Sequence, residues 1–553
     1  MIGLNALVAL LQATPAAPPN DPPVRLVVMI AVDQMIPDHL DRLAPWLHGG
    51  FGRFIEHGAV FERAALQHGD TETGPGHTCY GTGLNPTHHG IVSNQWFPIE
   101  GKNDVYCFGD GDSHAVTSNG IGKDGDVSPR NLRTGGFVDF VKSANKNSRA
   151  FAISSKDRAA IGMSGQHPDL ALWWNHGGRG FATSTWYAQA LPKWVLDWNA
   201  QWTRELFDGP LGKGWNCDFP EHFEGSGTAP DERDGEPGKA GQRSFPHALP
   251  AHSDPPTDKE LRTLAEAVYD GPAGDQFVCE MAGIAVEQLQ LGRDDDVDVL
   301  AISLSSCDLV GHAYGPLSCE VTDVLLRADR ELGALFDLLD AKVGKDRWIA
   351  SLSADHGVLE LPESLAARGV ASERMSSRIV GESFKAARAK VAEKFGKDFY
   401  LASHARGIRL SLAGMQEAKV EPAEVRRAYA DALRVSCAAW LEHVLTFDEL
   451  KAIARDGAPA TGLVRMEANS FDEQRTCDLV LLAKPWVLIG LPFGTTHGTP
   501  YPYDRNIPLA FYGPGFPQSH DYRDAASIDI VPTLLHRLKI AAPTPLDGRV
   551  LIE

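Results

Sequence analysis

The segment HGDTETGPGHTCYGTG, residues 68–83, places a threonine hydroxyl directly before a Gly-Pro-Gly turn. One interpretation is that Thr73 is a plain helix N-cap, because a threonine oxygen can accept N–H bonds from the first helical turn. The other is that Thr73 is a nucleophile, since the backbone N–H groups at a helix start favour an anion such as phosphate. A hydroxyl is a poor nucleophile at neutral pH unless a metal or a base activates it. The nucleophile hypothesis therefore requires an activating group elsewhere in the chain.

Three aspartates and three histidines follow apolar runs or lie in loops far apart along the chain. They are Asp33, Asp308, His312, Asp355, His356 and His497. Each alone is typical of a cap, a turn or a structural hydrogen bond. Together they form a set of zinc ligands, and two adjacent divalent ions stabilise both oxygens of an in-line displacement at phosphorus. The set therefore predicts two metal sites and favours Thr73 as a nucleophile.

The elements that must position these residues are short apolar runs typical of buried parallel strands. The runs lie at 24–32, 150–154, 297–304, 348–352 and 479–482. Between them, apolar positions over residues 321–339 recur on one face, which predicts a helix. Alternating strands and helices predict an α/β domain with helices on both faces of the sheet. Ligands bind beyond the carboxyl ends of such strands, where these runs place the Asp and His residues.

Two regions break the alternation. Residues 160–258 are rich in Gly, Pro and Trp, with tryptophans at 173 and 174, and predict long loops or an excursion over the sheet. Residues 359–478 contain a helical stretch from about 421 to 454 and predict an inserted subdomain. We therefore expect a catalytic core over 24–358 and 479–553, which includes the loop-rich excursion 160–258, and an inserted subdomain over 359–478.

The first residues combine an apolar run at 2–11 with the small-residue sequence ATPAAPP. This pattern predicts a signal peptide over residues 1–16 and a periplasmic or secreted protein, although the run has no basic start and the alternative is a disordered Pro/Ala tail. No later run is long and apolar enough for a membrane span. The net charge of −20 argues against a nucleic acid partner. The eight cysteines form no CxxC, and their pairing cannot be deduced from the sequence.

Seven motifs occur in a specific order after residue 24: AVDQM, HGDTETGPGHT, GIVSNQWF, SSKDRAA, SSCDLVGHAYG, SADHG and THGTPYPYD. In these motifs the chain resembles the alkaline phosphatase superfamily, in particular the monomeric bacterial enzymes with a threonine nucleophile, of the Sphingomonas and PafA type. The resemblance covers nearly the whole chain. It implies a three-layer α/β/α sandwich with a mostly parallel central sheet and an inserted subdomain, and a monomer with a two-zinc site.

The resemblance also implies a role for each site residue. One zinc would be held by Asp308, His312 and His497. The other would be held by Asp33, Asp355 and His356, with Thr73 bound to it as the nucleophile. Asn94, Lys156 and Arg158 would contact the nonbridging phosphoryl oxygens. If the segment after residues 150–154 stays extended, the spacing of two aims the Lys156 and Arg158 side chains the same way.

These residues suit a phosphomonoester, because it is largely a dianion near pH 7. We therefore expect an alkaline phosphatase that hydrolyses small phosphate monoesters through a phosphothreonine intermediate. A phosphodiesterase or nucleotide pyrophosphatase with the same metals is the first alternative. A non-catalytic secreted phosphate-ester-binding protein is the second, and divalent metals other than zinc stay open. A sulfatase is excluded because no C/S-x-P-x-R sequence surrounds Thr73.

Overall fold

Five parallel strands form the centre of the main sheet. The computed structural model describes residues 23–553 except 123–124, 176, 178–179, 209, 254–255 and 405. The central strands lie in the order β11 Trp348–Ser353, β1 Leu26–Val32, β10 Asp298–Leu304, β7 Ala150–Ser154 and β8 Leu170–Asn175. Nearly all their residues are buried, as expected of strands covered on both faces. The predicted strands at 24–32, 150–154, 297–304 and 348–352 are thus confirmed.

Further strands extend both edges of this sheet to eleven strands in all. On the β11 side they are β18 Leu509–Tyr512, β2 Ala59–Ala64 and β19 Ser519–Ala525, and on the β8 side β9 Gly180–Ser184, β5 Ala115–Thr117 and β6 Gly120–Ile121. Apart from β19, which runs parallel to β2, these edge strands pair antiparallel with their neighbours. The parallel part of the sheet is therefore its centre, where the carboxyl ends of the strands lie side by side.

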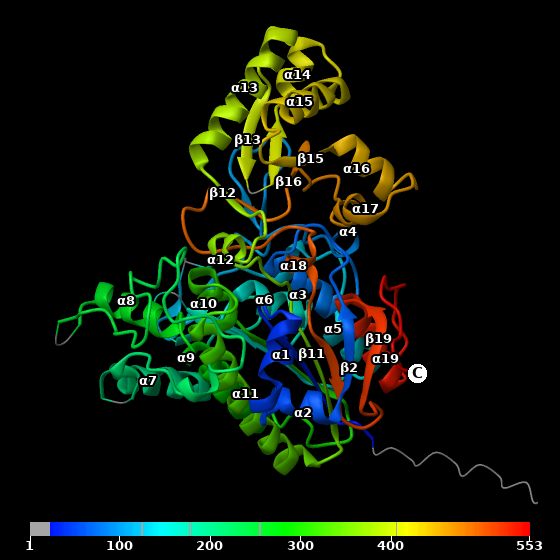
Figure 1. The fold of residues 1–553 in the computed structure, drawn as a ribbon. Helices are drawn as coiled ribbons and strands as arrows, with labels where there is room; N and C mark the ends of the chain where they lie inside the picture. Colours follow the sequence, from blue (N-terminus) through cyan, green and yellow to red (C-terminus); the bar gives the residue numbers. More distant parts are fainter. Residues whose placement is uncertain are drawn as a thin grey trace, which may run out of the picture.

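Helices pack on the sheet in two groups, which form the outer layers (Figure 1). One group is α2 Gly50–His57, α7 Lys193–Asp208, α8 Asp258–Tyr269, α9 Ala273–Gln288, α10 Ser306–Tyr314 and α11 Cys319–Leu339. The other is α3 Thr73–Thr82, α4 Pro86–His89, α5 Phe137–Ala144, α6 Asp157–Ser164 and α19 Ile530–Leu538. Helix α11 confirms the helix predicted over 321–339. The chain therefore has the predicted α/β fold, with layers of helices around a central sheet.

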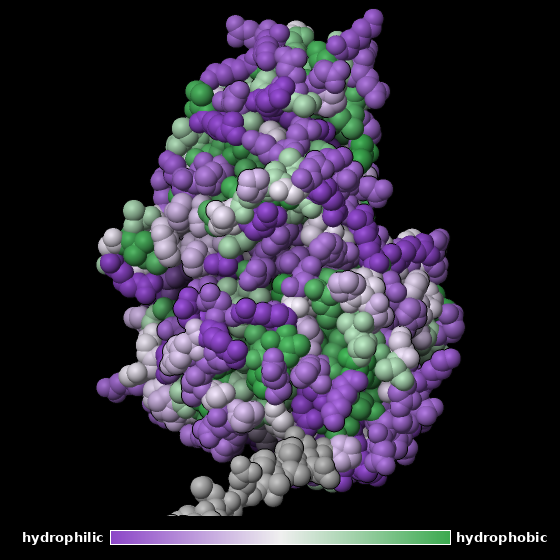
Figure 2. Space-filling view, turned by 90° about the vertical axis from the view of Figure 1, so that its right-hand side faces the viewer, coloured by the Kyte–Doolittle hydropathy of each residue, from purple (hydrophilic) through white to green (hydrophobic). Residues whose placement is uncertain are grey.

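A second, smaller sheet stands above the main one (Figure 1). It contains β13 Tyr400–His404, β14 Gly407–Leu410, β16 Leu479–Ala483 and β15 Leu441–Thr446. The helices α13 Ser377–Phe395, α14 Leu412–Ala418, α15 Pro422–Ser436, α16 Phe447–Ala454 and α17 Gly462–Asn469 accompany it. Its buried residues, among them Phe399, Tyr429 and Trp440, form a hydrophobic cluster separate from the main core. In Figure 2 this narrower upper part stands on the wider lower part and shows mostly hydrophilic side chains at its top.

Short elements join the two parts. Strand β12 Glu373–Met375 pairs with β17 Val487–Ile489, where the chain leaves for the small sheet and returns from it. Helices α12 Pro362–Ala367 and α18 Pro502–Arg505 flank this crossing, and α1 Pro37–Leu43 follows β1. The hairpin of β3 Gln95–Trp96 and β4 Val105–Tyr106 follows α4. The chain thus leaves the main sheet after β11 and rejoins it at β18.

Three sequence expectations about these regions are wrong. The run 479–482 is strand β16 of the small sheet, where it pairs antiparallel with β15, so residue 479 does not begin the return to the core. The expected helical stretch 421–454 is interrupted by β15, which is a strand paired with β16. The tryptophans at 173 and 174 lie in β8, so the region 160–258 contains the end of α6 and core strands as well as loops. An apolar run does not determine which sheet the strand joins, and short runs are ambiguous between helix and strand.

The other predicted domain boundaries stay predictions, and the predicted signal peptide lies outside the described residues. Over the described residues, no helix has the length and apolar character needed to cross a membrane. All eight cysteines fall within the described part of the chain, and each is a free thiol.

The start of α2 is held by a carboxylate on α11. Asp329 accepts N–H bonds from His48 at 2.9 Å, Gly49 at 2.6 Å and Gly52 at 3.1 Å. These groups lie at the helix start, where backbone donors have no partner within the helix. We expect Asp329→Ala to lower the free energy of unfolding by about 1–3 kcal/mol, because it leaves buried donors unpaired. Urea denaturation followed by circular dichroism measures this.

The matched control is Asp337→Ala on the same helix. Asp337 pairs with Arg53 of α2, but its side chain is 78% exposed. An exposed pair contributes at most about 1 kcal/mol, so this variant should differ little from the wild type. Equal losses in the two variants would contradict the capping role of Asp329.

Candidate dinuclear metal centre

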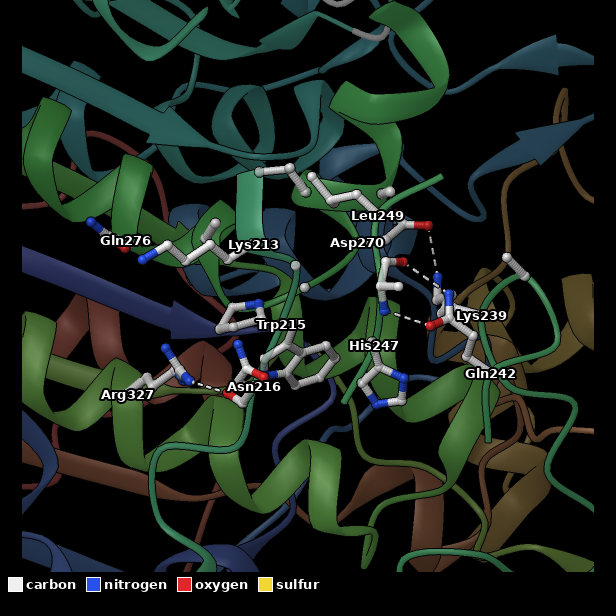
Figure 3. A pocket seen from close by; sticks show the side chains of 18 of the residues that line it. Lys213, Trp215, Asn216, Lys239, Gln242, His247, Leu249, Asp270, Gln276 and Arg327 are labelled. Carbon is white, nitrogen blue, oxygen red and sulfur yellow. Dashed lines mark hydrogen bonds and ion pairs between the residues drawn. The ribbon is translucent and has the colours of Figure 1, made fainter. Parts of the chain in front are cut away.

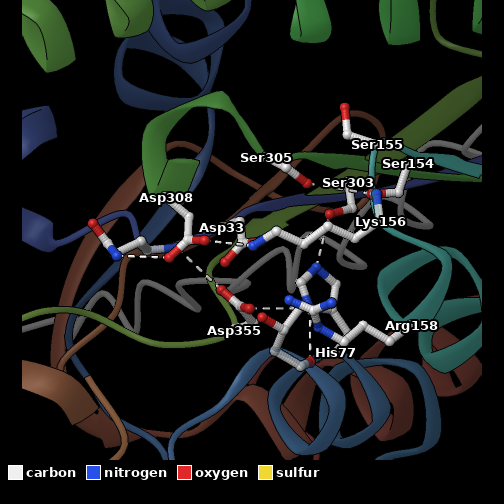
Figure 4. A network of polar contacts seen from close by, with 12 residues as sticks. Asp33, His77, Ser154, Ser155, Lys156, Arg158, Ser303, Ser305, Asp308 and Asp355 are labelled. Carbon is white, nitrogen blue, oxygen red and sulfur yellow. Dashed lines mark hydrogen bonds and ion pairs between the residues drawn. The ribbon is translucent and has the colours of Figure 1, made fainter. Parts of the chain in front are cut away.

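Four adjacent strands bring the predicted site residues to one edge of the sheet. Strands β11, β1, β10 and β7 are in register at their ends, with Val32 beside Leu304 and Ser303 beside Ser154. The residues that follow these ends are Asp355 and His356 after β11, Asp33 after β1, Asp308 after β10 and Lys156 after β7. Figure 4 shows the three aspartates and Lys156 pointing toward one another. The structure thus brings together residues that are distant in the sequence, as the strand pattern predicted.

Two groups of side chains have the arrangement of a metal site. Asp33, Asp355 and His356 are fully buried, and one ligand atom from each lies within 4.8 Å of the others. His356 Nε2 is 3.4 Å from Asp33 Oδ1 and 3.2 Å from Asp355 Oδ2. Asp308, His356 and His497 form a second group of the same kind. His356 therefore reaches both groups.

His312 was predicted to share a metal with Asp308 and His497. Its Nε2 lies 3.1 Å from Asp308 Oδ1, and His497 Nε2 lies 3.5 Å from the same oxygen. The rings of His312 and His497 are 5.2 Å apart, whereas those of His356 and His497 stack at 3.5 Å. His312 and His497 thus face the Asp308 carboxylate, and His356 faces those of Asp33 and Asp355.

The hydrogen bonds of the three rings fix which nitrogen is free. Nδ1 lies 3.0 Å from the carbonyl of Gly357 in His356, 2.8 Å from that of Thr495 in His312 and 2.7 Å from that of Thr71 in His497. A carbonyl only accepts, so each Nδ1 must carry the proton and each neutral ring has its lone pair on Nε2. The histidine ligands of metals are usually oriented by such bonds.

Each of these Nε2 lone pairs faces a carboxylate oxygen, which also only accepts when ionised. Asp33 Oδ1, Asp355 Oδ2 and His356 Nε2 are buried and have no hydrogen-bond partner among the described residues. Burial lowers the pKa of His356, and lowers that of His497 well below its usual value, which favours the neutral form of these two rings. Burial also opposes the charge of His312, but the Asp308 carboxylate raises its pKa. Facing acceptors repel unless a cation lies between them. This donor set of carboxylates and neutral imidazoles fits a divalent ion such as zinc.

Thr73 is the first residue of α3, and Glu72 is its N-cap. The N-cap interpretation of Thr73 is therefore wrong. The Gly-Pro-Gly sequence brings this helix start against the metal ligands: a Cβ on Gly76 would lie 2.2 Å from the backbone oxygen of Asp355. Only glycine permits this approach, so α3, which begins with the buried Thr73, packs closely against Asp355.

Hydrogen bonds connect Asn94 to Gly74 and Glu72, the two neighbours of Thr73 in the chain. Asn94 Oδ1 accepts from the N–H of Gly74 at 2.7 Å. The backbone N–H of Asn94 donates to Glu72 Oε2 at 2.6 Å, and the Ser93 hydroxyl donates to the same oxygen at 2.8 Å. Because Oδ1 is used by Gly74, the donor end of this amide, Nδ2, is the end suited to bind an anion.

Lys156 and Arg158 lie differently from the expectation. Helix α6 begins at Asp157, so the segment does not stay extended and only Lys156 has a strand-like backbone. The Lys156 ammonium bonds to Asp33 Oδ2 and, at 2.5 Å, to Asp308 Oδ2. Burial opposes its charge, but Asp308 and Asp33 raise the pKa of Lys156. Burial likewise opposes the charge of Arg158, while Tyr106 and Asp157 raise its pKa.

Sequence reasoning missed two residues that support this site, Glu72 and His77. The His77 ring is fully buried, with Nδ1 3.0 Å from the carbonyl of Thr73 and Nε2 2.8 Å from Ser303 Oγ. Its Nδ1 is also 3.1 Å from Asp355 Oδ2. The spacing of four residues from Thr73, one turn along a helix, was the available signal.

A cavity of about 460 Å³ lies elsewhere, between the loop around Trp215 and the helices α8 and α9 (Figure 3). Its lining includes Lys239, which pairs with Asp270, and Gln242 and His247. None of the predicted site residues lines it, so it is separate from the metal groups.

The sequence matches the family described as type I phosphodiesterase / nucleotide pyrophosphatase over residues 27–499. The chain belongs to this family. Alkaline phosphatase PafA from Elizabethkingia meningoseptica is 32% identical over 539 residues, which cover 96% of this chain and 94% of that protein. Alkaline phosphatase PhoK from a Sphingomonas species is 30% identical over 553 residues, 96% of this chain and 91% of that protein. The resemblance stated from the motifs is thus confirmed.

The fold agrees with this family assignment. The crystal structure of wild-type PafA superimposes with a TM-score of 0.85 at 30% identity, covering 96% of this chain and 98% of that chain. A second PafA structure, with the same score, carries replacements of a threonine, an asparagine, a lysine and an arginine. The intervals between those four positions are the intervals that separate Thr73, Asn94, Lys156 and Arg158 here.

The bonds of Glu72 predict that this carboxylate acts through Asn94. We expect Glu72→Gln, which keeps the size but removes the charge, to lower kcat/KM about tenfold for a phosphate monoester, by the scale of effects seen for groups that orient a site. Steady-state kinetics with p-nitrophenyl phosphate measure this. In an Asn94→Ala background, Glu72→Gln should lower kcat/KM little further, since both changes remove the same contact of the Asn94 side chain with the substrate.

The control is Glu393→Gln, the same chemical change at an exposed position of α13. It should leave kcat/KM unchanged. Fully additive losses from Glu72→Gln and Asn94→Ala would show that Glu72 does not act through Asn94.

Proposed function

We propose that this protein is an alkaline phosphatase that hydrolyses small phosphate monoesters at a site for two divalent cations, with Thr73 as the nucleophile. The observation that carries the proposal is the set of buried acceptors that face one another beside the start of α3. Asp33, Asp355 and His356 would hold one ion, and Asp308, His312 and His497 the other, with zinc favoured by the ligand types. His356 contacts both groups, so it joins the two sites.

Bound divalent ions would supply Lewis-acid stabilisation of the attacking and leaving oxygens and a lowered pKa for a coordinated hydroxyl or water. Thr73 Oγ attacks phosphorus and the bond to the ester oxygen breaks, so that the alcohol leaves with the proton lost by Thr73 and a phosphothreonine is formed. Water then cleaves the phosphothreonine bond, which releases inorganic phosphate and restores the Thr73 hydroxyl. The positive end of the α3 dipole favours the anionic phosphoryl group beside Thr73.

The preference for monoesters rests on Asn94, Lys156 and Arg158. A monoester has one more negative charge than a diester, and charge-assisted hydrogen bonds to it are strong. The matching intervals in the PafA variant support these three positions together with Thr73. Lys156 has a flexible stem, so its ammonium can turn from Asp33 and Asp308 to a phosphoryl oxygen when cations neutralise those carboxylates.

A phosphodiesterase is the second candidate, because the matched family is described by that activity. The two activities differ in the charge of the substrate and not in the metal ligands. A non-catalytic phosphate-ester-binding role is less well supported, since none of the predicted ligands is missing. A periplasmic or secreted location and a monomeric state stay predictions.

The role of Thr73 predicts a covalent intermediate. We expect Thr73→Ala to lower monoester turnover by roughly a thousandfold or more, because no oxygen is left to attack phosphorus. Thr73→Ser should keep partial activity. Mass spectrometry of acid-quenched wild type should find phosphate on Thr73, and metal analysis should find about two zinc ions in both wild type and Thr73→Ala.

Thr263→Ala, at an exposed position of α8, is the control and should be fully active. An active Thr73→Ala variant with phosphate on another residue would refute the assignment. Full wild-type activity after rigorous removal of metal would refute the metal site itself.

The positions of Lys156 and Arg158 predict which ester is preferred. Each single alanine variant should lose tens- to a thousandfold in kcat/KM on p-nitrophenyl phosphate, on the order of the loss when one charge-stabilising donor is removed. For bis-p-nitrophenyl phosphate, kcat/KM should fall much less, because this diester has one fewer anionic oxygen. A wild type that prefers the diester, or equal losses on both substrates, would leave the phosphodiesterase candidate standing.

A further inference from the structure

Gln34 follows Asp33 at the end of β1 and lies between the two groups of predicted metal ligands. It is 1% exposed and has a φ of 69°, in the left-handed region that residues other than glycine rarely adopt. Such strained backbone persists where the surrounding structure fixes it, and it clusters at functional sites. What Gln34 contacts therefore indicates what the strain maintains.

Two hydrogen bonds connect this residue to two carboxylates. Its backbone N–H donates to Asp355 Oδ1 at 3.1 Å. Its side-chain Nε2 donates to Asp308 Oδ1 at 2.6 Å. Asp355 and Asp308 belong to different metal groups. The left-handed backbone lets one residue reach both, so Gln34 spans the space between the groups.

The helix that carries Asp308 leaves room for this side chain. A Cβ on Gly311 would lie 2.1 Å from Gln34 Oε1, so a larger residue at 311 would displace the amide. Oε1 itself is buried and has no hydrogen-bond partner among the described residues. A buried polar atom without a partner costs free energy. The protein accepts this cost at Oε1, which indicates that the hydrogen bond from Nε2 to Asp308 is important.

The Gln34 side chain is neutral, and this neutrality is as informative as its position. Asp308 Oδ1 also lies near Nε2 of His312 and of His497, at 3.1 and 3.5 Å. A neutral amide donor orients this carboxylate without neutralising it, so its charge remains for a cation. Groups that orient a metal ligand in this way commonly set metal affinity. A residue that merely filled space would need no amide, and methionine would serve as well.

We propose that Gln34 is a positioning residue that fixes the Asp308 and Asp355 carboxylates relative to each other, and so sets the spacing of the two divalent cations. The inference rests on the proposed two-cation site and adds a residue that touches neither cation nor substrate. It assigns a function to the glutamine of AVDQM and the glycine of DLVGH, two motif positions with no role in the proposed reaction.

The test is binding of Zn²⁺ without substrate, by competition with a chromophoric chelator. Gln34→Met keeps the volume and removes the donor, and should weaken binding of at least one Zn²⁺ about 10- to 100-fold. Substitution with Co²⁺ should show a changed visible spectrum, which a merely structural role would not produce. Gln276→Met, at a less buried glutamine on α9, is the control and should bind Zn²⁺ as the wild type does.

A second set of variants covers a Gln34→Met protein that fails to fold. Gly311→Ala should weaken Zn²⁺ binding by displacing the Gln34 amide. Gln34→Gly keeps the backbone bond to Asp355 and relieves the strained φ, but should weaken binding because the amide is gone. Gly311→Ala added to Gln34→Gly should cost little more, because the group it displaces is already absent.

Wild-type Zn²⁺ affinity and an unchanged Co²⁺ spectrum in Gln34→Met or in Gln34→Gly would overturn the inference while leaving the proposed function intact. A wild type that binds fewer than two Zn²⁺ ions would overturn the proposed function and this inference with it.

Discussion

Negative charge concentrated at the ends of adjacent parallel strands is the constraint on which the rest of this structure depends. Asp33, Asp308 and Asp355 are almost fully buried at one sheet edge, where water cannot screen their repulsion. Burial raises the pKa of Asp33 well above its usual value, and Asp308 and Asp355 raise it further. Buried charges are tolerated when they are paired or coordinate metals. The ammonium of Lys156 meets only part of this requirement, and burial keeps the pKa of His356 and His497 low, so these two imidazoles add lone pairs rather than charge.

The surrounding residues can be understood as devices that keep this edge ordered. Carbonyls of loops turn each histidine so that Nε2 faces inward, and Gly76 lets the start of α3 approach Asp355. His77 joins the carbonyl of Thr73 to Ser303 of β10, which ties the start of α3 to the sheet. Glu72 orders Asn94 on the other side of the same helix start. Thr73, the proposed nucleophile, is thus positioned by rigid elements, which is what a reaction that depends on alignment requires.

The sequence was sufficient for the parts of the molecule that follow from a local pattern. Four apolar runs predicted the central strands because each is buried on both faces, and the rule that ligands lie beyond carboxyl ends of strands grouped the six ligand candidates. The run 479–482 joined the other sheet, because pairing partners are not encoded in hydrophobicity. The expectation that Lys156 and Arg158 aim the same way required an extended segment, and it failed because α6 begins at Asp157. Glu72 and Gln34 were not singled out, because their importance lies in hydrogen bonds between segments far apart in sequence.

The crossing at β12 and β17 has a consequence for how this fold diversifies. The chain leaves for the small sheet shortly after His356 and returns shortly before His497, so the whole excursion is closed at its base by two residues that face the same centre. The chain between them can lengthen, shorten or change its surface in the course of evolution without shifting either imidazole. Changes in the excursion are therefore separable from changes at the sheet edge that carries the candidate metal ligands.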